Sequence, residues 1–102
     1  MKTRVPVFFV LAATASASLG CGGTLYTVEI NDASNKVAQA KAIGAEKLAT
    51  YEYYYANEHL EAAMSEAAEG DYSDAIAFAE EAERHADKAI QLSREARRGA
   101  AR

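Results

Sequence analysis

The sequence contains no tryptophan, a single proline and a single cysteine. A disulfide needs two cysteines, so the lone Cys21 excludes an internal disulfide. The shortage of proline and the abundance of alanine are typical of a helical protein whose thin helices approach closely. At 102 residues, the chain has room for one small domain at most.

Positive charge is scarce as well. Fifteen acidic residues stand against eleven basic ones, and Lys2 and Arg4 lie in a segment that we expect to be removed. Without these two, nine basic residues remain against fifteen acidic ones, which gives a formal charge of −6. This balance argues against a nucleic-acid binder, which would show a basic face. It suits a soluble, self-repelling surface in an extracytoplasmic space.

The sequence patterns that carry catalysis are missing. There is no Gly-rich phosphate loop, no His-Glu-x-x-His or Glu-x-x-His spacing, and no Ser or Cys nucleophile with an identifiable base. Glu81 lies one helical turn before His85, so a metal pair is conceivable there, but a surface Glu–His pair is the simpler interpretation. We therefore expect no enzyme, no catalytic residue, no cofactor and no metal site.

The N-terminal segment has the three-part layout of a secretory signal. Lys2 and Arg4 make it basic, residues 5–11 are apolar, and small residues fill positions 12–18. The apolar part is too short to be a good membrane span. The pattern predicts that residues 1–20 are a signal peptide.

The segment from Ser18 to Gly23 resembles a lipobox, the site where bacterial lipoprotein-processing enzymes act. Gly20 and Cys21 fit the pattern, whereas Leu19 lies one position nearer the cysteine than usual. We expect cleavage before Cys21 and a membrane anchor through lipid on that residue, because each buried CH₂ contributes about 0.8 kcal/mol. Gly22 follows, which by resemblance to enterobacterial sorting favours the outer membrane, facing the periplasm. Ordinary secretory cleavage that leaves a free thiol is the alternative.

The rest of the chain predicts helices. We expect residues 21–31 to be a tether that runs extended, because Thr24, Tyr26 and Val28 favour β geometry. Capping side chains at 31–34 then open a helical domain over residues 32–99. Thr50 either caps a new helix or continues the previous one, and Gly70-Asp71 marks a turn. The expected helices span residues 33–49, 51–69 and 72–98.

Each expected helix has one apolar face. In the first helix this face includes Val37, Ala38, Ala42, Ala45, Leu48 and Ala49, in the second Tyr53, Ala56, Leu60, Ala63, Met64 and Ala67, and in the third Tyr72, Ala75, Ile76, Ala79, Ala82, Ala86, Ala89, Ile90 and Ser93. We predict an all-α fold, an antiparallel helical hairpin or a small three-helix bundle. The core is thin, since chains this short bury about 60% of their surface on folding. Alanine-lined faces suit tight internal packing or self-association as a coiled coil, so a homo-oligomer is possible.

Two family resemblances follow from this pattern. Residues 70–76, with Ala79 and Ala82, are similar to the turn and second helix of a tetratricopeptide repeat, but stacked repeats need about three units. Residues 48–53, with small or apolar residues at 56, 60, 63, 75, 79, 82 and 86 and Asp71-Tyr72, resemble the domain-of-unknown-function family numbered 4398. That resemblance implies a small helical envelope domain of the kind often found on lipoproteins, some beside a peptidoglycan-binding module. The family usually has proline where this chain has Thr50.

Four tyrosines crowd into five consecutive positions. They cannot all face one core on a helix, so we expect Tyr53 to be buried and at least one of Tyr51, Tyr54 and Tyr55 to be exposed or to cover the first helix. Exposed tyrosine is a common interface anchor, which makes these three the candidate partner-binding residues. Packing on the first helix is the simpler alternative.

Arginines at positions 94, 97, 98 and 102 mark the end of the last expected helix and the tail that follows it. Positive charge complements the dipole at a helix C-terminus. Contact with anionic lipid or cell-wall material is the more specific interpretation.

These observations favour a non-enzymatic, membrane-anchored envelope lipoprotein that serves as a helical interaction or structural module. We expect its partners to be the membrane, through Cys21, and an envelope protein or cell-wall component, with no nucleic acid. The alternative is a small periplasmic metal- or ligand-binding lipoprotein that uses His59, His85 and nearby carboxylates.

Overall fold

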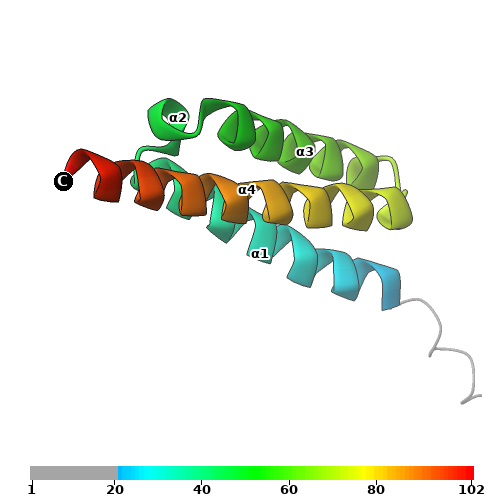
Figure 1. Ribbon diagram of the computed structural model, residues 1–102. Helices are drawn as coiled ribbons and strands as arrows, with labels where there is room; N and C mark the ends of the chain where they lie inside the picture. The colour runs from blue at the N-terminus through cyan, green and yellow to red at the C-terminus, as the bar shows by residue number, and fades with distance from the viewer. Residues whose placement is uncertain (1–20) are drawn as a thin grey trace, which may run out of the picture.

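The computed structural model describes residues 21–102, which form a bundle of three long helices and one short helix (Figure 1). The helices are α1 (Cys21–Ala42), α2 (Ala45–Leu48), α3 (Thr50–Ala68) and α4 (Tyr72–Ala100). The predicted all-α fold is confirmed. The predicted signal peptide, residues 1–20, lies outside the described part of the chain.

Helix α4 holds the bundle together, because it packs against both α1 and α3. Helices α1 and α4 run in the same direction, and α3 runs antiparallel to both (Figure 1). The start of α1 therefore lies at the same end of the bundle as the turn between α3 and α4. The short helix α2 and the last turns of α4 lie at the opposite end. No helix among the described residues is both long enough and apolar enough to cross a bilayer.

The expected extended tether over residues 21–31 is wrong, since this segment forms the first turns of α1. The hydroxyl of Thr27 donates a hydrogen bond of 2.8 Å to the carbonyl oxygen of Gly23, one turn earlier. The Tyr26 ring lies 5.7 Å from that of Tyr72 in α4, and Ile30 packs against the core. These contacts with the bundle outweigh the local β preference of the segment.

The expected continuous helix over residues 33–49 is interrupted once, at residues 43–44, and it ends near residue 49 as expected. Gly44 adopts a left-handed conformation with φ of 87°, which ends α1 and turns the chain into α2. Ala49, with φ of −144° and ψ of 56°, then separates α2 from α3. The buried face differs accordingly: Ala38, Ala42 and Leu48 are exposed, whereas the buried positions are Ala33, Val37, Ala40, Ala45 and Ala49.

Thr50 neither caps the new helix nor continues the previous one, which were the two alternatives. It is the first residue of α3, and its hydroxyl donates to the carbonyl oxygen of Glu46 at 2.8 Å, back toward α2. Proline suits the first position of a helix, so the family's usual proline would fit here. In this chain the backbone of Ala49 makes the break without proline.

The turn between α3 and α4 agrees with the prediction. Gly70 has φ of 84°, a conformation that favours glycine after the end of a helix. The Asp71 side chain accepts a hydrogen bond of 3.1 Å from the backbone N–H of Asp74 and so caps α4.

The core is built mainly from alanine. Tyr53, Ala56, Leu60 and Ala63 of α3 are buried as predicted, whereas Met64 is exposed. Buried alanines of α1, α3 and α4 belong to one core inside the bundle. On α4 the buried residues are Ala75, Ala79, Ala82, Ala86, Ala89, Ile90 and Ser93, all of which belong to the predicted face.

Candidate functional site

The tyrosines at the start of α3 divide into buried and exposed side chains. Tyr53 is buried, and this burial, together with the nearby Glu46 carboxylate, raises the pKa of its hydroxyl. Tyr51 is 70% exposed and Tyr54 is 50% exposed. Because they are three positions apart, both side chains lie on one side of α3. Two of the three predicted partner-binding tyrosines are thus accessible to a partner.

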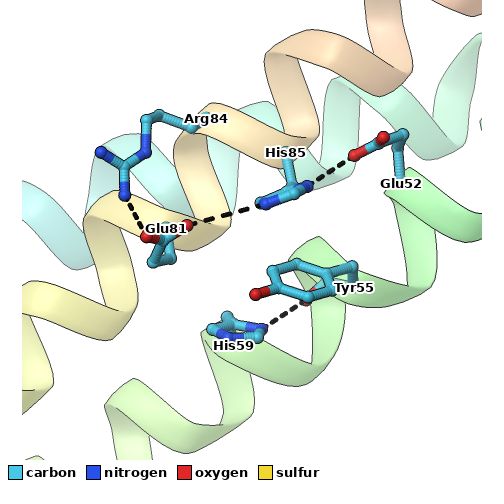
Figure 2. A network of polar contacts seen from close by, with 6 residues as sticks. All are labelled: Glu52, Tyr55, His59, Glu81, Arg84 and His85. Atoms are coloured by element: carbon cyan, nitrogen blue, oxygen red, sulfur yellow. Dashed lines mark hydrogen bonds and ion pairs between the residues drawn. The ribbon is translucent and has the colours of Figure 1, made fainter.

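Tyr55 differs from the other two, because it packs between α3 and α4. Its ring centroid lies 4.1 Å from that of His59, in a stacked arrangement, and 3.9 Å from that of His85. Figure 2 shows the phenol ring between the two imidazoles. Tyr55 is half-buried and serves the contact between the two helices, so of the three candidate tyrosines it is the one that is not exposed.

A polar network continues from this stack. The Nδ1 of His85, in α4, lies 2.5 Å from Glu52 Oε2 of α3, and since a carboxylate only accepts, the imidazole donates. The Nε2 of His85 lies 3.6 Å from Glu81 Oε2, and Glu81 also accepts from Arg84 (Figure 2). We call this group the α3–α4 clasp; its members are Glu52, Tyr55, His59, Glu81, Arg84 and His85.

The clasp places the two histidines near each other without giving them a common ligand position. His59 Nδ1 donates to the backbone carbonyl oxygen of Tyr55 at 2.9 Å, so this nitrogen carries the proton. Both nitrogens of His85 already face carboxylates. With Tyr55 between the rings, a single ion reaches both histidines only if that side chain moves. The arrangement suits a structural contact better than a metal centre.

Sequence reasoning found the Glu81–His85 pair but missed Glu52, the shorter contact of His85. Glu52 lies 33 positions away, and no local spacing could have indicated it. The only signal is the position of Glu52 beside the tyrosine cluster, near the inward side of an amphipathic helix.

Acidic side chains gather at the end of the bundle that contains the α3–α4 turn. Carboxylate oxygens of Glu66, Asp71 and Asp74 lie within 4.8 Å of one another. Loss of hydration and the negative charge of neighbouring carboxylates raise the pKa of Glu66. Between α1 and α4, the same two causes raise the pKa of Glu83, which faces Asp32 among others. Both groups are carboxylates that repel their neighbours.

The predicted cationic cluster lies at the opposite end, where one arginine has a structural role. The guanidinium of Arg97 donates a hydrogen bond of 2.5 Å to the carbonyl oxygen of Ile43, at the end of α1. Arg98 and Arg102 are exposed and, with Glu95 and Gly99, line a shallow hollow. The cluster therefore has a part that closes the α1–α2 turn and a part that is free to meet other molecules.

The comparisons with known proteins complete these observations. The model of the family described as Domain of unknown function (DUF4398) matches residues 28–102. The chain belongs to this family. The comparisons with curated proteins and with solved structures give no match. The DUF4398 match begins at Val28, within α1, and extends through α4, so it covers most of α1 and all of α2, α3 and α4.

Proposed function

We propose that this DUF4398 protein is a non-enzymatic envelope lipoprotein, held to a membrane by lipid on Cys21 and in contact with a partner through its helical domain. The anchor is supported by the secretory layout of residues 1–20 and by the lipobox resemblance around Cys21. Cys21 is the first residue of α1. Leu25 and Val28, on the next turns, are each about half exposed and suit the apolar side of a bilayer surface.

The exposure of Tyr51 and Tyr54 carries the interaction part of the proposal. Aromatic side chains with this much accessible area are common anchors at protein interfaces, where they lose water and fill a pocket of the partner. Both lie at the end of the bundle far from Cys21, where a protein held at a membrane would present them to the surrounding compartment (Figure 1). We therefore infer an envelope partner that docks on this side of α3.

The anchor is tested by replacing Cys21 with Ser in the full chain and fractionating cells. The wild-type protein is expected in the membrane fraction and labelled by radioactive palmitate, whereas C21S is expected to lose the label and to leave the membrane. Density-gradient separation of the two membranes then tests the outer-membrane location. A C21S protein that stays in the membrane fraction would show that lipid on this cysteine is not the anchor.

The interaction is tested by placing a photoreactive amino acid at position 51 or 54 and crosslinking in intact cells. We expect a discrete crosslinked product at these positions, and its loss when the remaining exposed tyrosine is changed to Ser. Tyr72 is the matched control, because it is also exposed but lies at the other end of the bundle. Crosslinks of equal yield from positions 51 and 72 would contradict a specific site on α3.

A further inference from the structure

Charge is divided unequally along the bundle. One half consists of residues 21–35 and 57–83, which meet at the α3–α4 turn, and we call it the acidic half. It holds eleven acidic residues and no lysine or arginine. The other half, residues 36–56 and 84–102, holds all nine lysines and arginines of the described chain and four acidic residues. The molecule is therefore negative at the Cys21 end and positive at the far end.

Part of the positive charge is used inside the protein. Lys36 pairs with Asp87 at 2.7 Å, which raises the pKa of this lysine, and Lys41 lies 3.7 Å from Glu46. Arg84 pairs with Glu81, and Arg97 binds the Ile43 carbonyl. Across residues 21–102, five cations have neither an ion pair nor a hydrogen bond within the protein: Lys47, Lys88, Arg94, Arg98 and Arg102.

Four of these five cations lie at the end of the bundle far from Cys21, and Lys88 alone lies near its middle. Lys47 belongs to α2, Arg94 and Arg98 lie on the last turns of α4, and Arg102 follows the end of that helix. Arg98 and Arg102, four positions apart, line the hollow together with Gly99 and one carboxylate, Glu95. Lys47, Arg94, Arg98 and Arg102 are called the basic end below.

The basic end is distant from the predicted anchor. Helix α1 has 22 residues and leads from Cys21 to the turn that Arg97 closes, a rise of about 33 Å at 1.5 Å per residue. Charges interact over about 8 Å at physiological ionic strength, so the basic end does not sense a membrane that holds Cys21. The acidic half repels an anionic membrane surface and so favours an orientation in which the basic end points away.

We propose that the basic end binds a carboxylate-rich polymer of the cell wall. This inference rests on the proposed function, in which lipid on Cys21 anchors the protein to a membrane. It adds the chemical class of the partner. The hollow at Arg98 and Arg102 has no apolar side chain in its lining. The strongest contacts of a protein–protein interface form in dry apolar pockets, whereas a hydrated polymer with repeated carboxylates requires only accessible cations. Tyr51 and Tyr54, exposed at the same end, offer aromatic faces on which the C–H groups of sugar rings can pack.

The test is a sedimentation assay with the full, processed chain in neutral detergent and protein-free cell-wall sacculi as the probe. We expect the wild type to sediment with sacculi at 50 mM NaCl and to be released at 500 mM. The R98Q/R102Q variant should bind about fivefold more weakly, as expected from two exposed charge contacts. The matched control R84Q/K88Q removes the same charge near the middle of α4 and should bind like the wild type. Circular dichroism checks that both variants keep their helices.

Two further arms identify the ligand. The protein should no longer sediment with sacculi whose carboxylates have been converted to amides. Vesicles of phosphatidylglycerol and phosphatidylcholine should not bind it at 150 mM NaCl. Equal binding to amidated sacculi, equal loss in both double variants, or vesicle binding that needs Arg98 and Arg102 would each overturn the proposal. The C21S variant separates the two hypotheses: it should leave the membrane and still sediment with sacculi. If C21S stays on membranes, the anchor is wrong, whatever the sacculi show.

Discussion

At the scale of single residues, Ser93 is the polar exception in an alanine core. It is fully buried on α4, on the face formed otherwise by residues such as Ala86 and Ala89. Within the described residues its hydroxyl has no hydrogen-bond partner. A buried hydroxyl without a partner loses its hydration and gains nothing in return, which costs about 1–3 kcal/mol. The Ser93 side chain is small enough to fit the alanine core, but burying its hydroxyl group is unfavourable.

Replacing Ser93 with Ala should therefore stabilise the protein. The matched control is S65A, because Ser65 is exposed on α3 and its replacement changes helix propensity alone. We expect S93A to raise the free energy of unfolding by about 1 kcal/mol more than S65A does. Urea unfolding followed by circular dichroism measures both. A destabilised S93A would mean that the hydroxyl has a partner and is needed.

Glu83 leads to a prediction about pH. Its pKa is raised by loss of hydration and by Asp32, Asp87 and Glu29, so the folded state holds this proton more tightly than the unfolded state does. Stability then falls as the pH rises from the unfolded pKa through the folded one, and the full cost remains at pH 7. We expect E83Q to be more stable than the wild type at pH 7 and to lose this advantage below about pH 4.

Urea unfolding at a series of pH values from 3 to 8 tests the prediction. The control is E80Q, which removes the same charge from an exposed position on α4. If E80Q and E83Q shift stability equally at every pH, the effect comes from net charge and not from the contact between α1 and α4.

At the scale of elements, the two glycine turns are not equivalent. Gly44 and Gly70 both have positive φ, a conformation that costs other residues about 1–2 kcal/mol. A Cβ at Gly70 would meet nothing within 4 Å, whereas one at Gly44 would lie 3.3 Å from Arg97 Nη2. That guanidinium binds the Ile43 carbonyl, so crowding at Gly44 also disturbs the closure of the α1–α2 turn.

G44A should consequently be more destabilising than G70A. We expect both to lower the free energy of unfolding by about 1 kcal/mol through backbone strain, and G44A by up to about 1 kcal/mol more through the lost hydrogen bond. Adding R97A to each variant isolates the second effect, because without the guanidinium the two replacements should cost the same. A difference that persists in the R97A background would assign the excess to another cause.

The elements that could be predicted from sequence are those with strong local signals. The Gly70-Asp71 turn and most of the buried face of α4 follow from turn chemistry and helical spacing and are confirmed. The exceptions on that face are Tyr72, which is exposed, and Ile76, which is half-buried. The segment before residue 32 could not be predicted, because its β-favouring side chains become helical only through contact with α4, as in the Tyr26–Tyr72 pair. Likewise, the Glu52–His85 contact and the Arg97 cap join residues 33 and 54 positions apart.

The tyrosine cluster lies between these cases. Its spacing predicts that the four rings cannot share one core, and Tyr53 is buried while Tyr51 and Tyr54 are exposed. The position of Tyr55 depends on the two histidines that flank its ring, one of them on α4. Sequence spacing gives the side of a helix, but only tertiary packing decides which side faces a neighbour.

At the scale of the whole molecule, the separation of charge opposes folding in one half. Eleven acidic residues in a half that has no lysine or arginine of its own raise the electrostatic free energy of the compact state. The pKa values of Glu66 and Glu83 are raised by loss of hydration first and by this repulsion second. Added salt screens such repulsion over distances of several ångströms. It also weakens the few ion pairs, but these are exposed or half-exposed and contribute little.

Stability should accordingly rise with ionic strength. We expect the urea midpoint of the protein to increase between 10 mM and 300 mM NaCl, and to increase less in an E66Q/E69Q variant, where two charges of the acidic half are removed. The matched control R98Q/R102Q, altered at the basic end, should keep at least the full salt response, because it leaves the repulsion in place. A midpoint that falls with salt would mean that the ion pairs outweigh the repulsion. In that case attraction between the acidic half and the cations of the rest of the bundle would exceed the repulsion within the acidic half.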